Sequence, residues 1–124
     1  HGRYYDFPPV KVFPKPAQKP HPPVFLGGTA TNVFKRVATW GNGWMPSRAN
    51  PEQVKAGRAS LDELADARGR DPKTIEILIF GAADLDEIKR MEDAGATMAT
   101  VGIPSSTPGE VFPALEKMAE ELLR

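Results

Sequence analysis

The chain has 124 residues, 40% of them apolar and 26% charged, which is typical of one ordinary globular domain with a modest core. Sixteen basic side chains balance sixteen acidic ones, so no basic excess favours a nucleic acid or an anionic membrane surface as a partner. The lack of cysteine excludes disulfides, thiolate catalysis and cysteine metal sites. We expect neither a membrane span nor a secretory signal, and a cytoplasmic setting by default.

Residues 1–23 are rich in aromatic side chains and in proline. Proline has no amide donor for a helix or a sheet, so regular structure is not expected here. We expect instead an extended segment that is pinned by its aromatic side chains. The chain starts with His1-Gly2 rather than methionine, which is expected of a fragment of a longer protein or of a chain whose first residues were added in cloning.

The first strand is expected at residues 24–26, a continuously apolar run of the kind that is buried on both faces. Gly27 and Gly28 end it, and Thr29 or Thr31 can cap the helix that follows. A strand, a glycine turn and a helix N-terminus together can hold an anion, because backbone N–H groups point outward there. The two glycines are also compatible with a plain tight turn.

Two helices and a short strand are expected next. Apolar residues at helical spacing predict a helix over residues 33–40, which Gly41 ends. Residues 43–45 have the composition of a very short strand. Residues 50–53 (Asn-Pro-Glu-Gln) form a capping box with proline in the first turn, and the helix that they start ends before Pro72.

The strongest strand signal lies at residues 74–80, which are β-branched and almost continuously apolar. Asp84 is expected to cap the following helix, with Asp86 as an acid in its first turn. A fourth strand is expected at residues 97–102, and a capping box at residues 107–110 starts the last helix. Alternation of strand and helix predicts a parallel sheet, either open or part of a (β/α)₈ barrel.

Short motifs are spread along most of the chain. They are PKP at residues 14–16, QKPHPP at 18–23, GG at 27–28, RVA at 36–38, GNGWMP at 41–46, GRDP at 69–72 and AGAT at 94–97. In this combination they resemble the luciferase-like monooxygenase family, which includes flavin-dependent monooxygenases and oxidoreductases that use the deazaflavin F420. The likeness is greatest to the branch described as F420-dependent. One departure is Asn42, where the family commonly has Asp, and Asn can make the same turn.

The resemblance implies a (β/α)₈ barrel of roughly 250 residues or more, of which this chain would supply the C-terminal half. We therefore expect residues 24–124 to form a parallel (β/α)₄ half of a TIM barrel. Residues 1–23 are expected to be a separate, extended segment rich in proline and aromatic residues.

In such a barrel, ligands bind at the carboxyl ends of the strands. The resemblance implies that Gly27, Gly28 and Thr29 contact the cofactor near its phosphate or side chain. Trp44 is a further candidate at the mouth of the barrel, although its ring could equally fill the barrel interior or the helix layer. Arg48 is a candidate for contact with an anionic substrate, the alternative being a solvated loop arginine.

No catalytic residue is assigned, because the family's F420 enzymes carry their acid and base groups in the other half of the barrel. No metal site is expected either, since the two histidines are not clustered and there is no cysteine.

Two classes of function follow. The first is the C-terminal part of a luciferase-like oxidoreductase or monooxygenase, which uses F420 or FMN for hydride transfer and is inactive alone. The second is a non-catalytic half-barrel module that associates with itself as a homodimer or higher oligomer. Self-association is expected because a half-barrel exposes an apolar concave face. The candidates for this face are Phe25, Met45, Ile77, Ile79 and Met98 or its neighbours, and the sequence leaves open which face of each strand is concave.

Overall fold

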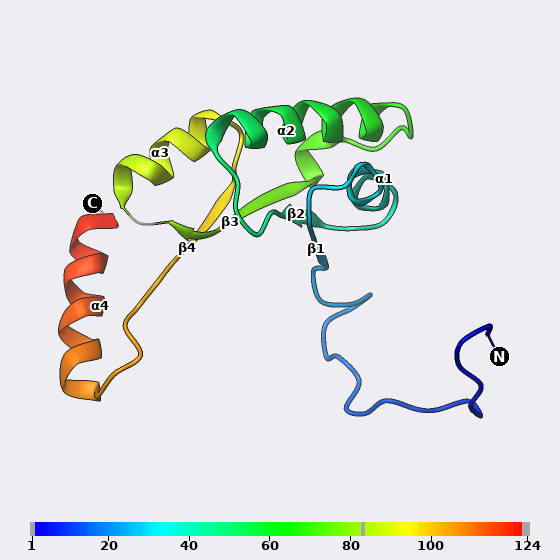
Figure 1. Cartoon of the computed structure of the whole chain (residues 1–124), viewed down its shortest axis with the longest axis horizontal. Coiled ribbons are helices and arrows are strands. Elements are labelled where there is room, and N and C mark those ends of the chain that lie inside the picture. The colour runs from blue at the N-terminus through cyan, green and yellow to red at the C-terminus, as the bar shows by residue number, and fades with distance from the viewer. Residues whose placement is uncertain (1, 83, 123–124) are drawn as a thin grey trace.

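The computed structural model describes residues 2–82 and 84–122, with the side chain of Thr31 excepted, and these residues form one parallel sheet with helices between its strands. The strands lie side by side in chain order, β1-β2-β3-β4, and every adjacent pair is parallel (Figure 1). The predicted alternation of strand and helix is therefore confirmed. The elements are β1 (Phe25–Gly27), α1 (Thr31–Thr39), β2 (Gly43–Met45), α2 (Pro51–Asp66), the 3₁₀ helix η1 (Pro72–Thr74), β3 (Glu76–Ala82), α3 (Leu85–Asp93), β4 (Met98–Val101) and α4 (Pro108–Leu122).

Three helices, α1, α2 and α3, cover one face of the sheet (Figure 1). The core lies between these helices and the strands. In β3, Ile77 and Ile79 point into it and are at most 5% exposed, while Leu78 between them is only half-buried. The buried cluster consists of Val33, Val37, Trp44, Val54, Leu61, Ala65, Ile75, Ile77, Ile79 and Met91.

Local capping explains where two of the helices begin. In α2 the Gln53 N–H donates to the Asn50 side chain at 2.9 Å, and the Asn50 N–H donates to the Gln53 side chain at 3.0 Å, so the predicted capping box is formed. In α3 the Glu87 N–H donates to Asp84 at 2.7 Å, which confirms Asp84 as the cap. Residue 83 of the loop before it lies outside the described part of the chain.

The first helix starts differently from the prediction. Ala30 occupies the cap position of α1, and no side chain makes a capping hydrogen bond there. Thr29 precedes the cap position and is exposed, and the side chain of Thr31 lies outside the description. The expected threonine cap is therefore not formed by Thr29.

No helix of the described residues lies over the opposite, concave face of the sheet. The ring of Phe25 lies across Gly43 in the neighbouring strand, and the register aligns Leu78 with Met98. Phe80 is 66% exposed and Met98 is 46% exposed. The prediction of an apolar concave face was right for Phe25, Met45 and Met98. It was wrong for Ile77 and Ile79, because strand alternation places the even-numbered residues of β3 on the concave side.

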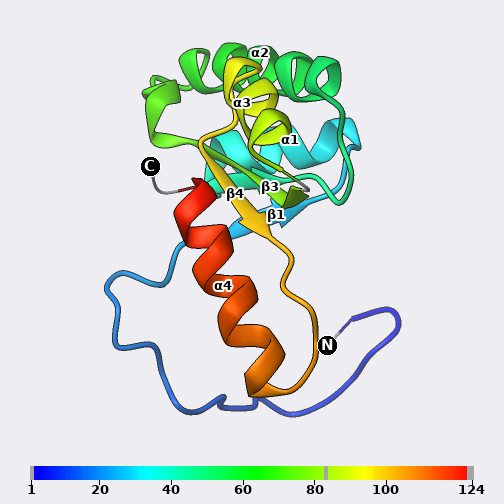
Figure 2. The ribbon, with the colours of Figure 1, turned by 90° about the vertical axis from the view of Figure 1, so that its left-hand side faces the viewer.

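The two ends of the chain pack little against the sheet. None of the described residues of α4 is buried, and a hollow of about 270 Å³ separates the helix from the ends of β3 and β4. Figure 2 shows α4 below the layer of the other helices, with the N-terminal segment extended beneath it. The aromatic side chains of that segment were expected to pin it, but Tyr4 and Tyr5 are more than 75% exposed.

The amino-terminal edge of the sheet is held by side chain to backbone hydrogen bonds. Asn42 Oδ1 accepts from the Val24 N–H at 2.8 Å, a role that its predicted turn conformation allows. Arg70 donates to the Val37 carbonyl at 2.9 Å, which ties the loop after α2 to the end of α1. Arg58 donates to the Ile75 carbonyl at 2.8 Å. Asn42 of the GNGWMP motif and Arg70 of the GRDP motif therefore contribute to stability at this edge, away from the expected ligand site.

Candidate functional site

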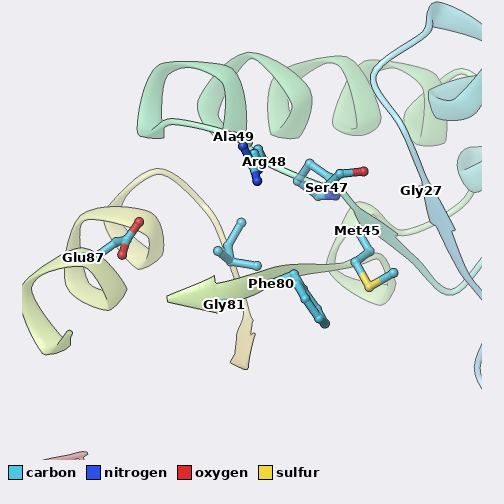
Figure 3. A pocket seen from close by; sticks show the side chains of 10 residues that line it. Gly27, Met45, Ser47, Arg48, Ala49, Phe80, Gly81 and Glu87 are labelled. Carbon is cyan, nitrogen blue, oxygen red and sulfur yellow. The ribbon is translucent and has the colours of Figure 1, made fainter. Parts of the chain in front are cut away.

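The carboxyl ends of β1, β2 and β3 meet at one edge of the sheet, because all the strands run in the same direction. An open hollow of about 630 Å³ lies there, between the strand ends and α3 (Figure 3). In Figure 3, Met45 and Phe80 project from the side of the strands that faces away from α2. The residues around the hollow that matter most below are Gly27, Met45, Ser47, Arg48, Phe80 and Glu87.

Of the glycine pair at the end of β1, Gly27 lines this hollow, and Gly28 follows it in the chain. Gly28 has a φ of +99°, a conformation that an L side chain rarely adopts, and a Cβ at this position would meet nothing within 4 Å. Gly27 has no such restriction, and a Cβ there would lie 3.5 Å from the Met45 carbonyl oxygen, in ordinary contact. The turn thus needs glycine at Gly28 for its backbone and leaves open space beside the main chain.

The N–H groups of this turn are available to a ligand. Among the hydrogen bonds of the described residues, none uses the N–H of Thr29 or Ala30, whereas the parallel pairing of Gly27 with Met45 directs the Gly28 N–H to the Met45 carbonyl oxygen. The first turn of α1 also lacks an acidic residue, whereas α2 and α3 each have acidic residues and a capping side chain. An uncapped helix start with free amide donors has a positive potential, which favours an anion.

Trp44 lies in the helix layer and not at the mouth. Its ring is 1% exposed and meets Phe34 of α1 edge to face, with the ring centroids 4.9 Å apart. The indole Nε1–H donates to the Gly28 carbonyl oxygen, with 2.6 Å between nitrogen and oxygen. Of the three locations left open by the sequence, the structure shows the helix layer. If Trp44 affects cofactor binding, it therefore does so through its hydrogen bond to the glycine turn.

The role of Gly57 was not predicted from the sequence, although this residue determines where Trp44 can lie. A Cβ on Gly57 would lie 2.3 Å from Cζ3 of the Trp44 ring. The signal was present, since an isolated glycine inside a helical pattern costs helix stability and usually has a packing reason. Here the reason is the close approach of α2 to an indole ring.

Arg48 lies in the loop after β2, where it is exposed and forms part of the wall of the hollow. It makes no ion pair with another residue in the described ranges. Glu87 of α3 lines the opposite side (Figure 3), and the sequence did not reveal it because it lies inside a helix. The hollow therefore has one cationic and one acidic side chain on its walls.

Other polar candidates have structural roles. Asp84 caps α3 and Asp86 lies in its first turn, as predicted for this pair. No cluster of three or more His, Cys, Asp or Glu side chains that could hold a metal occurs within residues 2–82 and 84–122. In the same ranges, no helix is both long and apolar enough to span a bilayer.

Comparison with known proteins identifies relatives over most of the chain. The sequence model of the luciferase-like monooxygenase family matches residues 1–118. An uncharacterised protein of Mycobacterium tuberculosis is 32% identical over 103 residues, which cover 82% of this chain and 35% of that protein. An FMNH₂-dependent dimethylsulfone monooxygenase of Pseudomonas putida is 34% identical over 67 residues, covering 48% of this chain and 18% of the enzyme. The chain thus spans about a third or less of these two relatives.

A solved structure shows the same fold. The coenzyme F420-dependent tetrahydromethanopterin reductase from Methanopyrus kandleri aligns with a TM-score of 0.64 at 15% identity. The alignment covers 82% of this chain and 50% of the reductase. This agrees with the predicted fold class, a parallel (β/α)₄ unit that corresponds to about half of a TIM-barrel-like luciferase fold.

Proposed function

The chain belongs to the luciferase-like monooxygenase family, and from this premise we propose that it is the cofactor-placing part of an oxidoreductase that uses F420 or FMN. The observation that carries the proposal is the glycine turn at the edge of the hollow, with free amide donors that lead into the uncapped start of α1. The cofactor, when bound, supplies the hydride chemistry. This chain's residues bind and orient it.

The residues present fit a phosphate group, which FMN and F420 both carry. Gly28 leaves open space beside its backbone, and the Thr29 and Ala30 amides have no partner among the described residues. Backbone amides at the start of a helix are a common way to bind phosphate. Gly27, Gly28 and Thr29 would therefore hold the phosphate, and Trp44 would act indirectly.

The wall of the hollow offers a second element of recognition. Arg48 is exposed beside the strand ends and has no ionic partner among the described residues, so it is free to meet an anionic group of a substrate. The acid and base groups of the reaction would come from outside this chain. We therefore propose that the chain alone shows no turnover with FMN or F420.

The test compares FMN with riboflavin, which has the same ring system and lacks the phosphate. Titration of the chain, followed by flavin fluorescence, is expected to give a micromolar dissociation constant for FMN and about tenfold weaker binding of riboflavin. Equal affinities for FMN and riboflavin, or binding of neither FMN nor F420, would contradict the proposal.

A substitution at Gly27 tests the location of the phosphate. Gly27→Ala places a methyl group in the hollow without strain, since its Cβ would make only ordinary contact. It is expected to weaken FMN binding about tenfold by blocking access to the main chain. The matched control is Gly102→Ala, where a Cβ meets nothing within 4 Å and the residue lies outside the hollow. Gly28 is less suitable, because its φ of +99° would strain any side chain.

A further inference from the structure

We infer that Trp44 is the positioning residue of the glycine turn, and that its indole N–H sets the direction in which the amides of the turn point. The inference rests on the proposed phosphate site. The direct observation is the hydrogen bond from Nε1 of Trp44 to the carbonyl oxygen of Gly28, at 2.6 Å, which joins β2 to the residue that follows β1.

This bond fixes a whole peptide plane. In a trans peptide the carbonyl and the N–H of the next residue point in opposite directions. The Gly28 carbonyl is directed to the buried indole, so the Thr29 N–H points away from the ring, to the exposed side of the turn. A peptide that turned over would present a carbonyl oxygen on that side and would repel an anion.

Because residue 28 is a glycine, its peptide needs an outside contact to hold one orientation. A residue without Cβ can adopt backbone conformations on both sides of the φ map, so Gly28 alone does not define the orientation of its peptide. The bond to Trp44 favours one orientation before a ligand arrives, and this preorganisation lowers the cost of binding.

The indole ring is itself held from two helices. Gly57 of α2 leaves no room for even a methyl group beside the ring, and Phe34 of α1 packs edge to face against it. With the ring 1% exposed, it cannot follow a displacement of the turn. The turn therefore adjusts to the ring, and the helix layer determines the geometry of the amides.

The test removes the N–H and keeps the ring. Trp44→3-benzothienylalanine replaces the indole nitrogen by sulfur in a bicycle of almost the same shape. The matched control is the same replacement at Trp40, which is 48% exposed and lies outside the hollow. We expect the Trp44 variant to keep its riboflavin affinity and to lose most of the roughly tenfold preference for FMN. The Trp40 variant should keep that preference.

A second measurement needs no variant and no ligand. Hydrogen exchange of the two indole N–H groups, measured by NMR, is expected to be at least about tenfold slower at Trp44 than at Trp40. Equal exchange rates would overturn the inference, whether or not the Trp44 variant folds.

The outcomes separate this inference from the function on which it rests. If the unmodified protein prefers FMN and the Trp44 variant retains the preference, the positioning role is wrong and the phosphate site stands. If the unmodified protein has no preference for FMN over riboflavin, the phosphate site is wrong and the inference falls with it.

Discussion

The two faces of the sheet differ in how completely this chain covers them. On the helix face, Ile77 and Trp44 are at most 1% exposed beneath α1, α2 and α3. On the concave face, Phe80 and Met98 are 66% and 46% exposed, and no helix lies over them. The helix face of β1, β2 and β3 is thus covered within the chain, whereas the concave face lacks the side chains that would pack against it in a barrel.

Because of this difference, substitutions on the two faces are expected to affect different properties, stability on one face and association on the other. Substitutions on the helix face should change the free energy of unfolding, because they remove contacts that the chain makes with itself. Substitutions on the concave face should change association, because the partner surface lies outside the chain. The four predictions below use this contrast.

The largest effect is expected on the oligomeric state of the chain in solution. The apolar side chains of the concave face and the open edges at β1 and β4 are features that soluble monomers usually avoid. A two-fold axis along the barrel axis would place β4 of one copy beside β1 of the other, in parallel, and close both edges at once. Light scattering with size exclusion at micromolar concentration should give the mass of at least two copies. A single species of 13.5 kDa that unfolds cooperatively would contradict this prediction.

The next largest effect is expected from Ile77→Ala. Ile77 is fully buried near the start of β3, and removal of its side chain leaves a cavity in the core beneath the helices. The free energy of unfolding in urea should fall by about 2–5 kcal/mol. Leu78→Ala is the matched control on the concave side of the same strand, and it should cost clearly less. Equal losses at the two positions would mean that the faces do not differ as proposed.

Gly57→Ala should destabilise the chain although alanine favours helices. The new Cβ would lie 2.3 Å from the enclosed ring of Trp44, and overpacking of this kind costs about 1–3 kcal/mol. That cost exceeds the roughly 1 kcal/mol that alanine gains over glycine inside a helix. The control is Ala56→Gly, at an exposed position of α2, which should cost about 1 kcal/mol through propensity alone. A stabilised Gly57→Ala protein would show that the ring can move aside.

The sequence predicted those features that depend on a few neighbouring residues. The capping box of Asn50 and Gln53 and the cap at Asp84 are local, and both are formed as expected. The parallel sheet followed from the order of the elements, and the hollow lies at the strand ends where ligand sites were expected. These predictions needed no knowledge of which residues meet across the fold.

Features that depend on distant contacts were not predicted. The face of Trp44 in a three-residue strand is determined by its contact with Gly57, which lies thirteen positions further along the chain. Ile77 and Ile79 were placed on the wrong face because almost all of β3 is apolar, so alternation has little contrast there. Glu76 was the one polar marker in that run, and its exposed side chain indicates the concave side. That α1 has Ala30 at its cap position and no side-chain cap could be recognised only from the backbone of the structure.

The smallest effect on stability is expected from Phe80→Thr, which should nevertheless change assembly. Phe80 is 66% exposed on the concave face, and threonine, like phenylalanine, favours strands. Measured at a dilution where copies separate, the free energy of unfolding should change by less than about 0.5 kcal/mol. The mass at micromolar concentration should shift toward one copy, because the removed ring is part of the apolar surface that a second copy would cover. Phe80→Tyr is the matched control, since it retains an aromatic ring and should retain association. If Phe80→Thr unfolds the chain, or leaves the mass of the associated species at micromolar concentration unchanged, the concave face is not where the copies meet.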